Sequence, residues 1–238
     1  MTLRKITDGV YILSGLIVNL YFIQAGNEIV LVDTGMPGND RLILQALKQL
    51  GKQPQDLTGI LITHLHRDHT GGLAALQRAT GAPVYMGKAD AELLKEGICM
   101  RPVEAAPGGL NRLVRRMMPA DEQSDRVEPV EVEYMVNEGV LLPLAGGIRA
   151  IHTPGHTAGH TAYLWLEAGG VLFAGDVASR MFGGLRYSFI YEDFRQGLES
   201  LRKIAALKFD VLCLSHGRPI IGEASLNFRR RLEQIQAL

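Results

Sequence analysis

The chain has 238 residues, 47% of them hydrophobic and 21% charged, which allows one large domain or two small ones without disulfide staples. The formal net charge is zero, so a broad nucleic-acid-binding surface is not expected. The two cysteines, Cys99 and Cys213, suit a reducing compartment, and we expect a cytoplasmic protein that does not enter a membrane.

The N-terminal part of the chain has the pattern of an α/β domain. The apolar stretch from Val10 to Ile23 is interrupted by Ser14, Gly15 and Asn19 and is too short to span a membrane, so it predicts strands at 10–13 and 17–24. The next predicted elements are a strand at 28–33, a helix at 41–50 between Asp40 as N-cap and Gly51, a strand at 59–63, a helix at 71–80 and a strand at 83–86.

Residues 88–131 differ from the rest of the chain, because they combine several prolines and mixed charge with two helical pieces, at 89–97 and 109–118. Strand patterns return after them. The predicted elements there are strands at 132–136, 139–144, 148–153, 161–167 and 170–176, a helix at 192–206, a strand at 210–216 and a terminal helix from Glu223. The whole pattern predicts a single domain, 1–238, with a helical insertion at about 88–131.

The seven histidines are confined to three short segments that each follow a predicted strand. The segment HLHRDH contains His64, His66, Asp68 and His69; HTPGHTAGH contains His152, His156 and His160; and CLSHG contains His216. Neutral imidazole is the commonest protein ligand for zinc-like metals, and carboxylates complete such sites. Because histidines used as general surface residues would be scattered, this clustering predicts a metal site, to which Asp176 at another strand end can contribute.

Two pairs of predicted strands resemble each other. The strands that lead into VDTG and AGD both end in an aspartate, Asp33 or Asp176, and the strands that lead into ITH and LSH both end in a histidine, His64 or His216. Two similar halves that face each other would bring these four strand ends together.

In order and spacing, these residues resemble the motifs of the metallo-β-lactamase superfamily. The motifs are Asp33 in VDTG, the H-x-H-x-D-H segment, His156 in PGHT, Asp176 and His216, so the resemblance covers most of the chain. It implies an α/β protein with the αββα sandwich of that family, in which two mixed sheets face each other with helices outside. It also implies a two-metal site at one edge of the sandwich.

The resemblance further implies a role for each site residue. His64, His66 and His156 would hold a first metal ion, Asp68, His69 and His216 would hold a second, and Asp176 would bridge them. Asp33 and His160 would orient ligands through hydrogen bonds, and Asp68 would also direct the attacking water and carry a proton. The implied cofactors are two divalent ions, in the first place zinc, with iron and manganese as alternatives.

The implied reaction is metal-dependent hydrolysis of a small-molecule thioester, lactone or ester. Relatives of the glyoxalase II type share the motifs but carry a C-terminal extension, and here 22 residues follow His216. Lactonases of the family have a tyrosine three residues after the bridging aspartate, where this chain has Ser179. Two alternatives stay open: a dioxygenase with one iron on His64, His156 and Asp176, and a phosphodiesterase or nuclease type.

The insertion at about 88–131 is expected to overhang the metal site as a lid, to form the interface of a homodimer, or both. Its Met117 and Met118 would line an apolar substrate pocket, for which Tyr187 and Tyr191 are further candidates. The arginines of the second helical piece, Arg112, Arg115 and Arg116, are interpreted as a solvated face.

Overall fold

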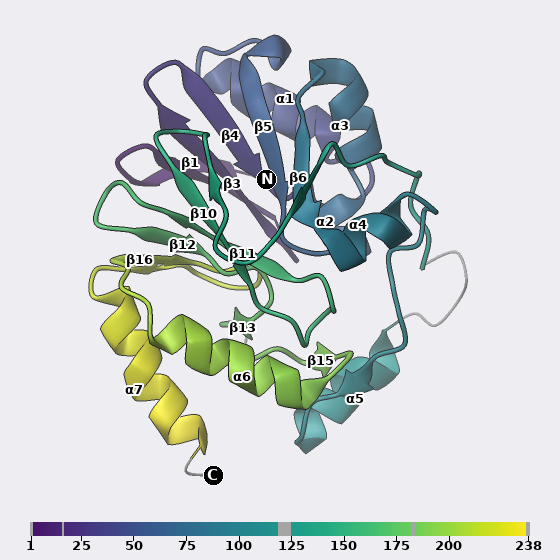
Figure 1. Cartoon of the computed structure of the whole chain (residues 1–238), viewed down its shortest axis with the longest axis vertical. Coiled ribbons are helices and arrows are strands. Elements are labelled where there is room, and N and C mark those ends of the chain that lie inside the picture. Colours follow the sequence, from purple (N-terminus) through teal and green to yellow (C-terminus); the bar gives the residue numbers. More distant parts are fainter. Residues whose placement is uncertain (1, 16, 119–124, 182–183, 237–238) are drawn as a thin grey trace.

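Two β-sheets lie face to face and carry helices on their outer faces, as Figure 1 shows. The computed structural model describes residues 2–15, 17–118, 125–181 and 184–236. Within these ranges the predicted αββα sandwich of two mixed sheets is confirmed. None of the helices in these ranges could span a bilayer, and Cys99 and Cys213 are both buried outside any disulfide.

The first sheet begins as an antiparallel meander of four strands and continues with strands parallel to the fourth. In spatial order its strands are β1 (Thr2–Thr7), β2 (Val10–Ser14), β3 (Asn19–Ala25), β4 (Glu28–Val32), β5 (Leu57–Ile62), β6 (Val84–Gly87) and β8 (Tyr134–Val136). Helices α1 (Asp40–Gln49), α3 (Leu73–Thr80) and α4 (Lys88–Leu94) pack against its outer face.

The second sheet contains, in spatial order, β17 (Ile220–Ile221), β16 (Val211–Cys213), β12 (Val171–Phe173), β11 (Thr161–Trp165), β10 (Ile148–His152) and β9 (Leu141–Leu142). Helices α6 (Phe194–Ala205) and α7 (Ala224–Gln236) cover its outer face. The other described elements are the 3₁₀ turn η1 (Pro54–Asp56), helices α2 (Arg67–Thr70) and α5 (Gly109–Met117), the pair β13 (Ala178–Ser179) with β14 (Arg186–Tyr187), and the pair β7 (Glu104–Ala105) with β15 (Ile190–Tyr191).

Three hydrophobic cores follow from the alternation of side chains along the strands. On β3, Leu20 and Phe22 point to the core under α1, α3 and α4, whereas Tyr21 and Ile23 point to the core between the sheets. Because successive side chains of a strand point to opposite faces, an unbroken apolar strand fits a sheet that is covered on both sides. The third core lies between the second sheet and its two helices.

The predicted likeness of two strand pairs is confirmed. Strands β4 and β5 are parallel neighbours in the first sheet, and β12 and β16 are parallel neighbours in the second. The residues that follow these strands are Asp33, Thr63, Ala174 and Leu214, so the polar segments of both halves begin at the same ends of their strands. The carboxyl ends of parallel strands are where α/β proteins place their ligand sites.

The helix predicted at 71–80 begins two residues later, as α3 at Leu73, and Gly71 and Gly72 separate it from the short helix α2. A Cβ atom on Gly71 would lie 2.3 Å from Cδ of Pro37, and one on Gly72 would lie 2.6 Å from the carbonyl oxygen of Thr34. Residues with side chains would therefore push away the loop after β4, which carries Asp33.

Several sequence-based boundaries are wrong. Helix α1 begins at Asp40, which therefore lies in its first turn, and the N-cap residue is Asn39. Strand β1 was not predicted, because Arg4 and Lys5 make it polar; charged residues are typical of such edge strands. The two-residue strands β7, β13, β14, β15 and β17 are defined by tertiary pairing and have no sequence pattern of their own.

The segment 88–131 has two structural parts on either side of Cys99. Helix α4 belongs to the first sheet's outer layer, where Ala91 and Leu94 are buried. The chain after it forms β7, which pairs with β15 of the other half of the molecule, and then α5. Residues 119–124 lie outside the described ranges.

Two buried tyrosines connect the sheets in opposite directions. Tyr21 on β3 of the first sheet donates a hydrogen bond to the carbonyl oxygen of Leu214 in the other half, at 2.6 Å. Tyr163 on β11 of the second sheet contacts the carbonyl oxygens of Ile62 and Tyr85, at 3.0 and 3.2 Å. Both aromatic rings are buried in the hydrophobic core between the sheets, and only the hydroxyl at the tip of each ring reaches a polar partner, which is a backbone carbonyl of the other half.

Removing the Tyr163 hydroxyl should weaken this connection without emptying the core. We expect Tyr163→Phe to lower the free energy of unfolding by about 1–2 kcal/mol, because two buried carbonyls lose a shared donor. Tyr11→Phe is the matched control, since Tyr11 is half-buried and its hydroxyl has no hydrogen bond among the described residues. Denaturant unfolding of both variants checks this, and equal stabilities would contradict it.

Candidate metal centre

Three histidine rings meet at the edge of the sandwich with nitrogen atoms facing one another. Nδ1 of His66 lies 3.1 Å from Nε2 of His64 and 3.0 Å from Nε2 of His156. All three side chains are buried. Nitrogen ligands about 2.0 Å from a tetrahedral zinc ion are about 3.3 Å apart, so the spacing is close to that of a metal site.

The tautomers of four site histidines follow from the partners of their Nδ1 atoms. Each Nδ1 atom faces an oxygen that must accept: Oγ1 of Thr63 for His64 at 3.0 Å, Oδ2 of Asp33 for His69 at 2.9 Å, the Ile190 carbonyl for His156 at 2.8 Å and the Ile17 carbonyl for His216 at 2.7 Å. The Thr63 hydroxyl accepts because its own proton goes to Asp33. Nδ1 therefore carries the proton, and the Nε2 lone pair is directed into the site.

A second group of ligand-type atoms lies beside the first. Nε2 of His216 is 3.4 Å from Oδ2 of Asp68 and 3.1 Å from Oδ2 of Asp176, and Nε2 of His69 is 3.6 Å from Oδ2 of Asp68. Asp176 also lies 3.5 Å from Nε2 of His156, so its carboxylate faces both groups. Within each of three sets the ligand atoms are within 4.8 Å of one another: His64 with His66 and His156, His64 with His69 and Asp176, and Asp68 with His69 and His216.

Several of these buried atoms have no hydrogen-bond partner among the described residues. They include Nε2 of His69 and Oδ1 of Asp176, which lie 3.8 Å apart in the centre. A buried polar atom without a partner costs about 1–3 kcal/mol, so a cluster of them needs a compensating group. A divalent cation supplies that compensation for nitrogen lone pairs and carboxylates alike, and the donor set therefore fits a metal.

The charges of the centre separate its histidines into two classes. Burial and neighbouring histidines hold the pKa values of His64 and His66 well below the usual range, so these rings are neutral, as a metal ligand must be. Burial alone would also lower the pKa of His69, but Asp68, Asp33 and Asp176 raise it to about 9. At His216, too, burial would lower the pKa, but the carboxylates of Asp176 and Asp68 outweigh that effect and raise the pKa well above its usual value.

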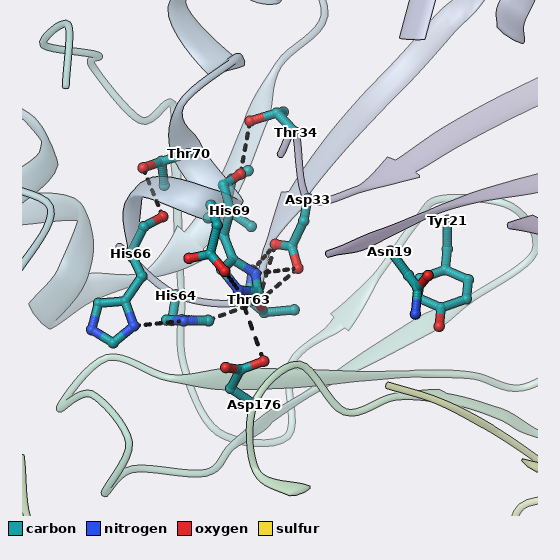
Figure 2. A network of polar contacts seen from close by, with 12 residues as sticks. Asn19, Tyr21, Asp33, Thr34, Thr63, His64, His66, His69, Thr70 and Asp176 are labelled. Carbon is teal, nitrogen blue, oxygen red and sulfur yellow. Dashed lines mark hydrogen bonds and ion pairs between the residues drawn. The ribbon is translucent and has the colours of Figure 1, made fainter. Parts of the chain in front are cut away.

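Asp33 holds the histidine segment from the side of the first sheet. Its Oδ1 accepts a hydrogen bond from the backbone N–H of Thr63 at 2.8 Å, and Figure 2 shows the carboxylate facing both Thr63 and His69. Asp33 has a φ of 61°, which is unusual for a residue with a side chain. Such strain is tolerated where surrounding contacts fix the residue, so the position of Asp33 is set by this network.

His160 lies behind the centre and fixes Asp176. Its Nδ1 is 2.8 Å from Oγ1 of Thr153, and its Nε2 accepts the backbone N–H of Asp176 at 3.1 Å. A Cβ atom on Gly175 would lie 2.6 Å from that Nε2, so a glycine is needed for the close approach. His152 is the more distant histidine, and its Nε2 contacts the carbonyl of Ala158 at 2.9 Å.

Asp90 is a functional candidate that the sequence reasoning missed. It is fully buried, and its Oδ2 accepts hydrogen bonds from the Leu65 N–H and the Thr157 hydroxyl. Its Oδ1 accepts from the Gly159 N–H and from Nη1 of Arg101, both at 2.8 Å. Asp90 thus joins the two segments that carry His64, His66 and His156. The available signal was its place in the first turn of α4, directly after strand β6.

A cavity of about 510 Å³ opens onto the centre, and its wall includes His66, Asp68, His156, Asp176 and His216. Five of the eight methionines of the chain line it: Met36, Met100, Met117, Met118 and Met181. Methionine is flexible and polarisable, so a wall of this kind adapts to apolar groups of different shape.

The predicted pocket residues occupy different places relative to this cavity. Met117 and Met118 line it, whereas Tyr187 and Tyr191 are not among its lining residues. The Tyr187 hydroxyl donates to the carbonyl of Pro107, and the buried Tyr191 hydroxyl accepts the N–H of Ser188. Arg67, in the middle of the histidine segment, also lines the cavity, and its Nε has no hydrogen-bond partner among the described residues.

Comparisons with known proteins agree with this geometry. A protein with the curated name "Probable metallo-hydrolase YflN", from Bacillus subtilis, is 29% identical over an alignment of 243 positions, which covers 95% of this chain and 89% of that protein. A hydroxyacylglutathione hydrolase from Albidiferax ferrireducens is 36% identical over an alignment of 155 positions, which covers 62% of this chain and 46% of that protein.

Solved structures show the same fold. A metallo-beta-lactamase variant from Cronobacter sakazakii superposes with a TM-score of 0.74 at 22% identity, covering 100% of this chain and 94% of that one. A subclass B3 metallo-beta-lactamase of Bradyrhizobium japonicum gives a TM-score of 0.72 at 25% identity, covering 99% and 92%. The family model for the metallo-beta-lactamase superfamily matches residues 13–216. The chain therefore belongs to the metallo-beta-lactamase superfamily.

Proposed function

We propose that the protein is a hydrolase with two divalent metal ions, which acts on an activated carbonyl in a thioester, lactone or ester. The observation that carries this proposal is the convergence of imidazole lone pairs whose opposite ring nitrogens are all held by acceptors. That arrangement places the proton of each neutral ring on Nδ1 and leaves the inward-facing Nε2 as the ligand atom for a cation.

His64, His66 and His156 would hold the first ion, and Asp68, His69 and His216 the second. The carboxylate of Asp176 faces both groups and would bridge them. Ions bound there would lower the pKa of a water molecule toward neutrality and polarise the substrate carbonyl. Zinc suits the histidine-rich first group, and iron and manganese are compatible with the mixed second group.

Asp68 is the residue best placed to direct the attacking water. Its side chain is 24% exposed, compared with 7% for Asp176 and 2% for Asp33, and it forms part of the cavity wall. Burial would raise the pKa of Asp68, but His69 and His216 hold it well below its usual range. The carboxylate is thus ionised and can accept a hydrogen bond from water and pass a proton to the leaving group.

The substrate is proposed to be an acyl compound with an apolar acyl group. Val114, Phe189 and Ile190 join the methionines in the cavity wall, and the segment from Met100 to Met118 supplies one side of it. We therefore propose this segment as the lid that selects the acyl group. The hydroxyacylglutathione hydrolase among the relatives is consistent with thioester chemistry.

The dioxygenase alternative needs a single iron on His64, His156 and Asp176. It leaves the second group of ligand-type atoms without a role, although the ligand atoms of Asp68, His69 and His216 also lie within 4.8 Å of one another. The dinuclear proposal uses both groups and is preferred for that reason. A phosphodiesterase or nuclease would place its substrate phosphate and the groups around it directly at the metal ions, where the cavity wall is largely apolar.

Metal binding should occur at two ions per chain and should depend on pH. In metal-free protein the raised pKa values of His69 and His216 keep these rings protonated at neutral pH, so metal uptake must displace about two protons. We expect affinity to increase with pH and to level off above about 9, the pKa of His69. Elemental analysis and calorimetry in buffers of different ionisation enthalpy measure both quantities. One ion per chain after metal has been supplied would support the dioxygenase instead.

Replacing Asp68 should lower the rate of hydrolysis without removing the metal ion from the first group of ligands. We expect Asp68→Asn to lower kcat by about 10²–10⁴-fold, because an amide cannot take a proton from water, while the ion on His64, His66 and His156 is retained. His152→Gln is the control, since this ring contacts only a backbone carbonyl among the described residues. Steady-state hydrolysis of a thioester and metal analysis of each variant provide the test, and a wild-type kcat in Asp68→Asn would refute the role.

Shortening the methionines of α5 should alter acyl-group selection. We expect Met117→Ala with Met118→Ala to change the ratio of kcat/KM between long and short acyl chains by about tenfold, since an apolar contact is worth about 1–3 kcal/mol in discrimination. Met135→Ala on β8 is the matched control, because Met135 is 46% exposed and does not line the cavity. Rates that fall equally for all chain lengths would mean that these methionines do not select.

A further inference from the structure

A second cavity of about 510 Å³ lies beside the metal centre and has a different chemical character. Three arginines line it: Arg4 from the edge strand β1, Arg180 from the segment after β13, and Arg218 from the segment after His216. Asn19 and backbone of Gly15 and Gly217 complete its polar wall. The described residues that line it include no aspartate or glutamate.

The arginines are available to a ligand. Arg180 is held in place because its Nη1 donates to the carbonyls of Arg218 and Pro219, both at 3.2 Å. Arg4 and Arg218 are exposed, and neither side chain has a carboxylate partner in the part of the chain that the structure describes. Three guanidinium groups around one cavity without a neutralising carboxylate form a site for a multiply charged anion.

This arginine cavity directly adjoins the methionine-lined cavity that opens onto the metal centre. Ile17 and Met181 line both, so they form the rim between them. The same backbone segments also hold a metal-ligand candidate, because the Ile17 carbonyl accepts Nδ1 of His216 and the Arg180 N–H donates to the His216 carbonyl. One extended substrate can therefore reach from the arginines to the metal centre.

We propose that the substrate is a thioester whose thiol carrier bears phosphate groups, with the carrier in the arginine cavity and the apolar acyl group in the methionine-lined cavity. This inference rests on the proposed hydrolase function. A carrier such as glutathione pairs its carboxylates with an ammonium group, which would call for an acidic partner, and the described lining residues offer none. Phosphate groups carry only negative charge and match three arginines.

The reaction balances without a further reactant. The oxygen of a water molecule forms a bond to the acyl carbon, and the bond from that carbon to sulfur breaks. The products are a carboxylic acid and the free thiol of the carrier, which takes up the second proton of the water. Recognition of the leaving group at a distance from the reacting carbonyl would raise kcat/KM by positioning the carbonyl.

The kinetic test compares three octanoyl thioesters: that of coenzyme A, that of glutathione and that of uncharged N-acetylcysteamine. We expect wild-type protein to prefer the coenzyme A thioester, and Arg4→Ala with Arg218→Ala to lower its kcat/KM relative to the N-acetylcysteamine thioester by about tenfold or more. Arg202→Ala with Arg230→Ala is the control for lost positive charge, since these exposed arginines of α6 and α7 line neither cavity.

Three results would overturn the inference. Equal rates for the coenzyme A and N-acetylcysteamine thioesters would show that the arginine cavity does not recognise the carrier. An equal loss of rate for both thioesters in the arginine variant would mean that the arginines have only a structural role. A preference for the glutathione thioester with the same arginine dependence would assign the cavity to a carboxylate carrier.

A binding measurement separates this inference from the proposed hydrolysis. Free coenzyme A should bind wild-type protein in calorimetry, weaken with added salt, and bind about tenfold or more weakly to Arg4→Ala with Arg218→Ala. Binding without hydrolysis of any thioester would overturn the proposed function and keep the phosphate site. Hydrolysis without binding of coenzyme A would keep the function and overturn the site.

Discussion

Two buried carboxylates hold the histidine segment after β5, and the geometry of the whole centre depends on them. Asp33 accepts the N–H of Thr63 and contacts His69, and Asp90 accepts the N–H of Leu65 on the other side. A buried carboxylate is stable only when its oxygens are fully hydrogen-bonded, so each one fixes the backbone groups that serve it. Asp90 extends this constraint to Thr157 and Gly159 and so ties the two histidine segments together.

Asp90 also anchors the start of the segment from Met100 to Met118, which forms one side of the methionine-lined cavity. Arg101 donates to Asp90 and, at 3.0 Å, to Glu192, whose other oxygen accepts the N–H of Ala158. Arg101 begins the chain that leads through β7 to α5, so the base of this segment is anchored to both histidine segments. Its far end differs, because Met117 is 76% exposed. The centre thus combines firmly hydrogen-bonded ligand-type side chains with an adaptable methionine wall, which suits the proposed hydrolysis of variable acyl groups.

The sequence was most informative where several chemical groups had to occur together. The histidine segments were identifiable because a metal ligand set needs several imidazoles and carboxylates in short loops, and the residues expected to be ligands do lie together in three sets. Asp90 was not identified, because a single aspartate after a strand is common and its four hydrogen-bond donors come from distant parts of the chain. Strands β7 and β15 were missed for a related reason, since each exists only through its pairing with the other.

The sequence by itself determined the fold class, the order of the main strands and helices, and the set of residues that meet at the sheet edge. The order of the elements follows from local periodicity, and the clustered histidines follow from residue types that one chemistry requires. The fold class and the full set of site residues follow from the resemblance of the motifs to those of the metallo-beta-lactamase superfamily. The tertiary structure alone decided which ring nitrogen of each histidine faces inward, because the acceptors for the other nitrogen are Ile190, Ile17, Thr63 and Asp33. It also decided that Tyr191 is not part of the wall of the methionine-lined cavity and that three arginines from separate segments line a second cavity. Such arrangements depend on how distant backbone segments approach each other, and local sequence carries no signal for that distance.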